Sequence, residues 1–184
     1  RKDQNMFHLA AYKKCDYDTF IYLLNFASSA PEKFKTYFLK TDDWGHTPLI
    51  IAAADGQLNK LNAILNSNVD SEIVNSIFEN VNWNSENIFH LAATNNFDCD
   101  TFIYLFKFAS SDLGKLKTYF LKRDESGDTP LIVATYHGQL NKLKAVLDSN
   151  VDPEIVNSLF DNINQTGENL FHNTAFSYCD YDTF

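Results

Sequence analysis

Short helical patterns separated by polar stretches run along the chain. Around residues 58–65, leucines recur at the 3.6-residue spacing of an amphipathic helix. The segment before it begins with Thr47-Pro48, a capping hydroxyl followed by a proline suited to a first helical turn. That segment ends at Gly56, and glycine tolerates the left-handed conformation of a helix C-terminus. These features predict a helix, a turn and a second helix.

A third, shorter helix is predicted after the second one. Asp70 and its counterpart Asp152 can cap this helix, and acidic residues in the first turn favour its positive end. Polar tips that contain glycine, TDDWGH at 41–46 and RDESGD at 123–128, then predict hairpin-like turns. The apolar face of the third helix is expected to comprise Ile73, Val74, Ile77 and Phe78.

The whole pattern is repeated. NMFHLAA at 5–11 recurs as NIFHLAA at 87–93 and as NLFHNTA at 169–175, and about two-thirds of positions 5–82 are identical in 87–164. Weaker copies, TPLIIAA and TPLIVAT, divide each large unit in half. We therefore expect a single solenoid over 1–184, cut through a repeat at both ends, in which stacked neighbours supply the core. The repeats are expected to start near residues 5, 47, 87, 129 and 169.

These segments resemble the ankyrin repeat family. The best copies of its TPLHxAA first helix, glycine turn, leucine-rich second helix and hairpin lie at 41–65 and 123–147. The resemblance implies an all-α fold with short hairpin loops, an α-solenoid of stacked helix-turn-helix repeats. Each repeat exceeds the family's usual length by about seven to nine residues, and we expect this surplus to form the additional short helix.

The threonine and histidine of the family motif are divided between alternating repeats. Thr47 and Thr129 lie in repeats without the histidine, whereas His8, His90 and His172 lie in repeats where asparagine replaces the threonine. This regular alternation predicts an adapted stack with a changed hydrogen-bond register.

Composition and charge narrow the possible partners. The apolar share is 45%, and 15 Lys and Arg against 24 Asp and Glu give a net charge of −9. This balance argues against nucleic acid, because phosphate backbones are bound by clustered Lys and Arg. The basic, aromatic segment at 33–40 is better interpreted as a solvated helix than as a membrane contact. Cys15, Cys99 and Cys179 form no CxxC pair, which is typical of a reducing, cytoplasmic compartment.

No catalytic, metal or cofactor site is predicted. The FH histidines occur once per large unit, and metal ligands must converge within a few ångströms. No glycine-rich phosphate loop and no nucleophile elbow occurs. Three acid pairs precede second helices and are interpreted as caps rather than as general acids and bases. These pairs are Asp16/Asp18, Asp98/Asp100 and Asp180/Asp182.

Differences between the two large units indicate the binding surface. They gather at first-helix ends and hairpin tips, which the resemblance implies form a concave groove for a protein or peptide partner. Trp44, Trp83, Tyr12 and Tyr136 are the predicted anchors, because aromatic side chains are enriched among interface hot spots. The complete predicted set is Tyr12, Lys13, Lys14, Asp43, Trp44, His46, Ala54, Asp55, Trp83, Asn84, Thr94, Asn95, Asn96, Glu125, Ser126, Asp128, Tyr136 and His137.

Neutral drift of exposed positions is the alternative explanation of these differences. Against it, residues such as Lys60 and Glu72, which we expect on exposed faces of the second and third helices, return unchanged. The patch at 30–32 does differ and lies away from the predicted groove.

The predicted function is a non-catalytic protein–protein interaction module. Acidic tips such as Asp42/Asp43 and Asp124/Glu125 favour a partner with a partly basic surface. The alternatives are a substrate-recruiting region of a larger enzyme whose catalytic domain lies outside this chain, and a structural spacer. Enrichment in Asn, Phe, Lys, Ile and Tyr, together with near-identical ankyrin-like duplication, also suggests a secreted bacterial effector that acts on proteins in the host cytoplasm.

Overall fold

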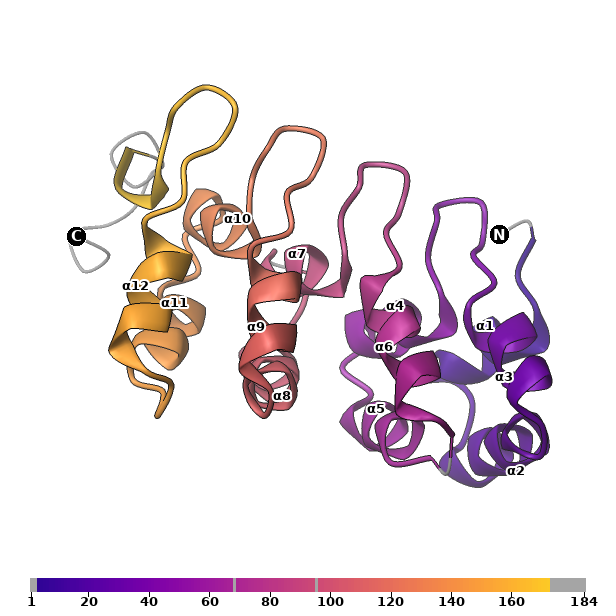
Figure 1. The fold of residues 1–184 in the computed structure, drawn as a ribbon. Helices are drawn as coiled ribbons and strands as arrows, with labels where there is room; N and C mark the ends of the chain where they lie inside the picture. Colours follow the sequence, from indigo (N-terminus) through magenta and orange to yellow (C-terminus); the bar gives the residue numbers. More distant parts are fainter. Residues whose placement is uncertain (1–2, 68, 95, 173–184) are drawn as a thin grey trace. The chain divides into compact units, whose positions relative to one another are not determined.

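The computed structural model describes residues 3–67, 69–94 and 96–172 and divides into two compact units, Arg1–Trp83 and Asn84–Phe184. Within the described residues, each unit contains two successive triplets of helices (Figure 1). The loop that follows each third helix projects beyond the helices of its unit. Apart from one bridge between Ile163 and Asn169, the regular structure in the described residues is helical. The predicted all-α repeat fold is confirmed.

In both units, the two first helices pack beside each other, and so do the two second helices. In unit 1, α1 packs beside α4, α2 beside α5, and α3 beside α6. The helices of unit 1 are α1 (Met6–Ala11), α2 (Tyr17–Ser28), α3 (Pro31–Phe38), α4 (Pro48–Ala54), α5 (Leu58–Leu65) and α6 (Ser71–Glu79). In unit 2, α7 packs beside α10 and α8 beside α11. The helices of unit 2 are α7 (Ile88–Ala93), α8 (Cys99–Ser110), α9 (Leu113–Phe120), α10 (Pro130–Tyr136), α11 (Leu140–Leu147) and α12 (Pro153–Phe160).

The predicted helix starts coincide with the observed N-caps. Asn5, Thr47, Asn87 and Thr129 precede the four first helices. The Thr47 hydroxyl accepts the Ile50 N–H, but the buried Thr129 hydroxyl makes no capping hydrogen bond. The repeat expected near residue 169 continues beyond the described residues.

In the odd repeats, aromatic packing holds the third helices, α3 and α9, against the first helices. The Phe7 ring of α1 stacks on Tyr37 of α3 with centroids 4.7 Å apart and contacts Phe38 at 5.1 Å. In unit 2, Phe89 repeats both contacts with Tyr119 and Phe120 at 5.2 and 4.9 Å. Aromatic pairs of this kind contribute about 0.5–1.5 kcal/mol beyond their buried area. The surplus residues of each odd repeat therefore belong to the core.

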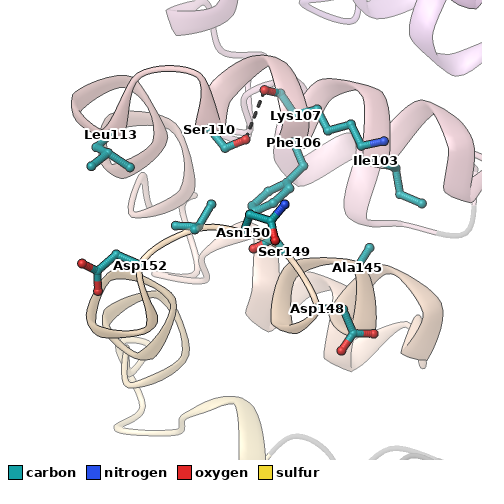
Figure 2. Close-up of a pocket in the computed structure, with 11 residues that line it drawn as sticks. Ile103, Phe106, Lys107, Ser110, Leu113, Ala145, Asp148, Ser149, Asn150 and Asp152 are labelled. Atoms are coloured by element: carbon teal, nitrogen blue, oxygen red, sulfur yellow. Dashed lines mark hydrogen bonds between the residues drawn. The ribbon is translucent and has the colours of Figure 1, made fainter.

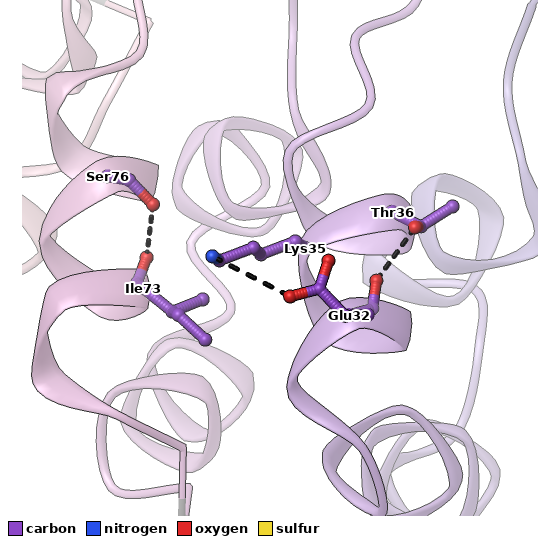
Figure 3. A network of polar contacts seen from close by, with 5 residues as sticks. All are labelled: Glu32, Lys35, Thr36, Ile73 and Ser76. Carbon is purple, nitrogen blue, oxygen red and sulfur yellow. Dashed lines mark hydrogen bonds and ion pairs between the residues drawn. The ribbon is translucent and has the colours of Figure 1, made fainter.

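The side chains of Lys35, Thr36 and Ser76 make local polar contacts on the third helices of unit 1. Figure 3 shows Lys35 of α3 extending toward α6 while it pairs with Glu32 of its own helix at 3.9 Å. Thr36 and Ser76 each donate a hydrogen bond to a carbonyl of the preceding turn. An exposed ion pair contributes little stability, so the buried faces of α3 and α6 hold these helices in place.

The alternation of Asn–His and Thr repeats has a structural cause. Asn5 Oδ1 accepts the N–H groups of Phe7 and His8, and its Nδ2 donates to the Tyr37 carbonyl at the end of α3. His8 Nδ1 accepts the Asn5 N–H at 3.1 Å, and its Nε2 donates to the His46 carbonyl of the hairpin at 3.1 Å. A threonine hydroxyl has no second nitrogen donor to reach the third helix. Asparagine therefore caps two helices at once.

The same bonds recur in unit 2. Asn87 Nδ2 donates to the Tyr119 carbonyl, and His90 Nε2 donates to the Asp128 carbonyl at 3.1 Å. Both buried histidines are structural, and burial lowers the pKa of His8 and of His90 although the carbonyl acceptors favour the protonated form.

A buried lysine joins the two repeats of each unit. Lys60 of α5 is only 2% exposed, and its Nζ donates to the carbonyls of Ala10, Tyr12 and Cys15 at 2.8, 2.6 and 2.8 Å. These carbonyls lie at the C-terminal end of α1 and in the following loop, where helix carbonyls lack intrahelical partners. The expectation that Lys60 lies on an exposed face is therefore wrong. The duplicate retains a lysine at this position because the buried side chain has a structural role.

Lys142 of α11 occupies the equivalent place in unit 2. Its Nζ donates to the carbonyls of Thr94 and Phe97 at 2.6 and 2.9 Å. Burial lowers the pKa of both lysines, while nearby acidic groups such as Asp16 and Asp98 raise it. We call these two side chains, Lys60 and Lys142, the lysine clamps.

Replacing a lysine clamp is expected to destabilise its unit. Lys60→Met keeps the apolar stem but leaves three carbonyls without their charged donor, so we expect the free energy of unfolding to fall by about 2–4 kcal/mol. Urea unfolding followed by circular dichroism measures the change. Lys144→Met, an exposed substitution on α11, is the matched control and should change stability by less than about 0.5 kcal/mol. Equal effects of the two substitutions would contradict the clamp.

The buried histidines predict a pH dependence of stability. Because His8 and His90 have lowered pKa values in the folded state, the unfolded chain takes up protons first as the pH falls below about 6.5. Stability is therefore fully present above neutral pH and declines on acidification. Urea midpoints measured between about pH 7.5 and 5.5 should fall for the wild type and less steeply for His8→Gln/His90→Gln. An equally steep fall in this variant would show that other groups cause the dependence.

Candidate protein-binding site

The hairpin tips that follow α3 and α9 are each built around one acidic residue, Asp42 or Asp124. Asp42 Oδ1 accepts the N–H groups of Trp44 and His46, both at 3.0 Å, and the turn closes with Asp42 N–H donating to the His46 carbonyl. Asp42 is 3% exposed. Burial opposes a lowered pKa of Asp42, but the N–H donors and Gln4 outweigh it. Asp42 therefore shapes the tip and does not contribute the exposed charge that the sequence suggested.

Both tryptophans of the chain project from hairpins of unit 1. Trp44 is 60% exposed and Trp83 is 73% exposed. The two hairpins pack closely, since a Cβ atom at Gly45 would lie 2.8 Å from the Asn82 Cα, and Gly45 has a φ of 77°. A side chain at position 45 would therefore force the neighbouring hairpin away.

Unit 2 repeats this packing with other side chains at the tips. Asp124 Oδ1 accepts the N–H groups of Ser126 and Asp128, and Gly127 lies against Gln165. Ser126 and Gln165 occupy the positions equivalent to Trp44 and Trp83. The tip scaffold is thus shared by the two units, whereas the exposed side chains are not.

The ends of α1 and α4 enclose an open depression in unit 1. Its volume is about 710 Å³, and Leu9, Tyr12, Lys13, Lys14 and Asp55 line it. The Asp55 carboxylate accepts the Lys13 N–H at 3.0 Å, which ties the loop after α1 to the end of α4. The lysine clamp holds the same loop through the Tyr12 and Cys15 carbonyls.

Gln4 connects this depression to the base of the first hairpin. Its Nε2 donates to the Tyr12 hydroxyl at 3.2 Å and to Asp42 Oδ2 at 3.1 Å. The loop after α1 and the base of the first hairpin are therefore linked through Gln4. We give the name unit-1 face to the half-buried Tyr12 together with the exposed residues of the depression and of the two tips, Leu9, Lys13, Lys14, Trp44, Asp55 and Trp83.

Unit 2 offers a smaller set of exposed candidates. Tyr136, at the end of α10, is 70% exposed, and its ring meets the His137 ring edge-on with centroids 5.6 Å apart. Asn96 is exposed, whereas the Thr94 hydroxyl donates to the Leu91 carbonyl. The predicted residue Asn95 lies outside the described residues.

Several predicted residues have structural roles. The Asp128 carboxylate accepts the Asn164 amide at 3.0 Å, and its pKa is raised by burial and by Asp124 and Glu168. The Glu125 N–H donates to the Asn84 carbonyl at 3.0 Å. The remaining predicted positions divide by exposure: Ala54, Asn84, Glu125 and Ser126 are exposed, and Asp43 and His46 are half-buried.

The candidates for chemistry have ordinary structural explanations. Asp16 and Asp98 cap α2 and α8 by accepting the N–H groups of Thr19 and Thr101. Burial raises the pKa of the Cys99 thiol, which makes it a poor nucleophile. Across the described ranges, no group of three or more His, Cys, Asp or Glu side chains could hold a metal ion. Cys179, Asp180 and Asp182 fall outside those ranges.

No helix in the part of the chain that the structure describes is long and apolar enough to cross a membrane. A sequence model described as ankyrin repeats matches residues 61–157 with three copies, which is more than half of the chain. The chain belongs to the ankyrin repeat family. No curated protein matches it. Ankyrin repeats are in general protein–protein interaction modules, and they are typically non-catalytic.

Sequence reasoning missed the residues that hold the ankyrin-type surface in place. Lys60 and Lys142 recur at equivalent positions, and this recurrence was the available signal, although a lysine on an amphipathic helix is usually exposed. Gln4 gave no comparable signal, because Glu86 replaces it in the duplicate.

Proposed function

We propose that this ankyrin-repeat chain binds a protein or peptide partner through the unit-1 face, with Tyr136 and His137 as separate contacts in unit 2. The observation that carries the proposal is that both tryptophans are exposed at hairpin tips of the unit that also has the open depression. Large, rigid aromatic side chains bury much area at low entropic cost, and tryptophan and tyrosine are enriched among hot spots.

Divergence between the two units supports this assignment. The duplicate has serine, glutamine and threonine in place of Trp44, Trp83 and Tyr12, whereas the buried residues around the tips and clamps are retained. Lys60 no longer counts against neutral drift, because it is buried. Exposed Glu72 on α6 does count, since it returns unchanged as Glu154.

Charge on the partner is also part of the proposal. The exposed Glu125 and the half-buried Asp43 at the tips favour a partly basic partner surface. Asp42 adds nothing to this preference because it is buried. Lys13 and Lys14 are exposed beside the depression and favour acceptor groups at that point of the partner.

We further propose that the protein is a secreted bacterial effector whose partner is a host protein in the host cytoplasm. The composition and the near-identical duplication support this. Fusing the full-length protein to a reporter enzyme and assaying transfer into host cells tests it. Transfer, together with a host-derived partner, supports the effector role, whereas a partner endogenous to the source cell contradicts it.

Truncating the anchors should weaken partner binding without unfolding the chain. A partner captured on the immobilised chain, identified by mass spectrometry and purified, allows Kd to be measured by calorimetry. The single substitution Trp44→Ala should raise Kd by about 30-fold, the loss typical of a hot spot. Tyr136→Ala should raise Kd if the partner also reaches unit 2.

Tyr22→Ala provides the matched control. Tyr22 is 76% exposed on α2 and lies outside the unit-1 face, so its removal should leave Kd unchanged. Circular dichroism should be the same for all variants. Intact binding after both Trp44→Ala and Tyr136→Ala would overturn the proposed surface.

A further inference from the structure

A second cavity lies in unit 2, away from the residues assigned to partner binding above. It opens where α8 and α11 end and where α9 and α12 begin, and its volume is about 610 Å³ (Figure 2). This volume falls within the range of small-ligand and peptide side-chain pockets. We call it the α8–α11 cleft.

The floor of the cleft is apolar. The buried Phe106 ring points into it, and Figure 2 places Leu113 at one end and Ile103 at the other. Leu113 is exposed at the start of α9 although it is a large apolar residue. An occupant that covered Leu113 would remove its exposed apolar surface from water, next to the edge of the buried Phe106 ring.

One wall of the cleft carries unpaired negative charge. Asp148 is the C-cap of α11, and no hydrogen bond or ion pair to its carboxylate is found among the described residues. A carboxylate at a helix C-terminus faces the negative end of the helix dipole, which is unfavourable. Asp152 lines the same wall at the start of α12.

At the position equivalent to Asp148, unit 1 has an uncharged residue that is hydrogen-bonded within its own helix. The equivalent Asn66 donates its amide to the Asn62 carbonyl at 2.8 Å, so it caps its own helix without charge. A cation supplied from outside would relieve the charge of Asp148, and no such relief is required at Asn66.

The floor and the opposite wall have diverged together with Asp148. Unit 1 has Leu24, Asn25 and Pro31 where the cleft has Phe106, Lys107 and Leu113. The small polar residues that shape the cleft, Ser110, Ser149 and Asp152, have identical counterparts in unit 1. The changes therefore concern the lining and leave the backbone scaffold alone.

We propose that the α8–α11 cleft is a second binding site, which takes a peptide segment with an apolar side chain next to a lysine or arginine. The apolar side chain packs on Phe106 and Leu113, and the cation lies against Asp148 at the end of α11. Lys107, exposed on the α8 wall, faces the carbonyl groups of the segment and sets its direction. This site is independent of the unit-1 face.

A library of random short peptides displayed on phage, selected against the whole chain, tests the proposal. Enriched sequences should combine apolar and basic residues, and their synthetic, fluorescently labelled versions allow Kd to be measured by anisotropy. Asp148→Asn should raise Kd by about fivefold and Leu113→Ser by about tenfold. Asp148→Asn restores the residue type of unit 1 and removes a charge that disfavours α11, so the variant should fold.

Asp161→Asn is the matched control. Asp161 is an exposed C-cap of α12 outside the cleft, and its substitution removes the same charge at the same kind of helix position. Kd should be unchanged in this variant and in Trp44→Ala. The proposal is overturned if no peptide is enriched, if the enriched peptides are acidic, or if Asp148→Asn and Asp161→Asn behave alike. Loss of peptide binding in Trp44→Ala would place the peptides on the unit-1 face and overturn it too.

Discussion

The arrangement depends on a lysine ammonium group buried between the two repeats of each unit. The first helices α1 and α7 end with carbonyls that have no partner in their own helix, and these ends are covered by α5 and α11, the second helices of the next repeats. Lys60 supplies three donors to the carbonyls of Ala10, Tyr12 and Cys15, and Lys142 does the same work in unit 2. The clamp also fixes the loop that lines the depression of unit 1. The same interaction therefore stabilises the unit and positions the loop of the candidate binding surface.

A second constraint determines where the hairpins stand. In the odd repeats, asparagine caps the first helix and binds the end of the third helix, while histidine holds the carbonyl of the following hairpin. In the hairpin that follows, Asp42 or Asp124 accepts the N–H groups of the tip and so fixes the turn from inside. Exposed side chains at these tips are not needed to form the turn, so they can differ between units, as Trp44 and Ser126 do.

The sequence was sufficient to predict the helices and their caps, but it was insufficient to predict which charged side chains are buried. The Asp70 cap and the apolar face of α6 can be predicted from the local sequence, because each depends only on residues close by along the chain. Lys60 and Asp42 were placed at the surface because charged residues are usually exposed, and their partners lie in other repeats or in backbone groups of a turn. Among the candidate binding residues, exposure of Trp44 and Tyr136 follows from position in the repeat. The internal role of the Asp128 carboxylate depends on Asn164 in the next hairpin, which no local pattern indicates.

We propose that the hairpin tips and the end of α1 in unit 1 bind the partner. Hydrogen–deuterium exchange of the chain with and without its purified partner tests this most directly. We expect slower exchange on binding in residues 9–14, 42–46 and 82–83, with no change along the exposed side of α2 around Tyr22. Protection confined to α2 and α3, with the tips and the loop after α1 exchanging as in the free chain, would contradict it.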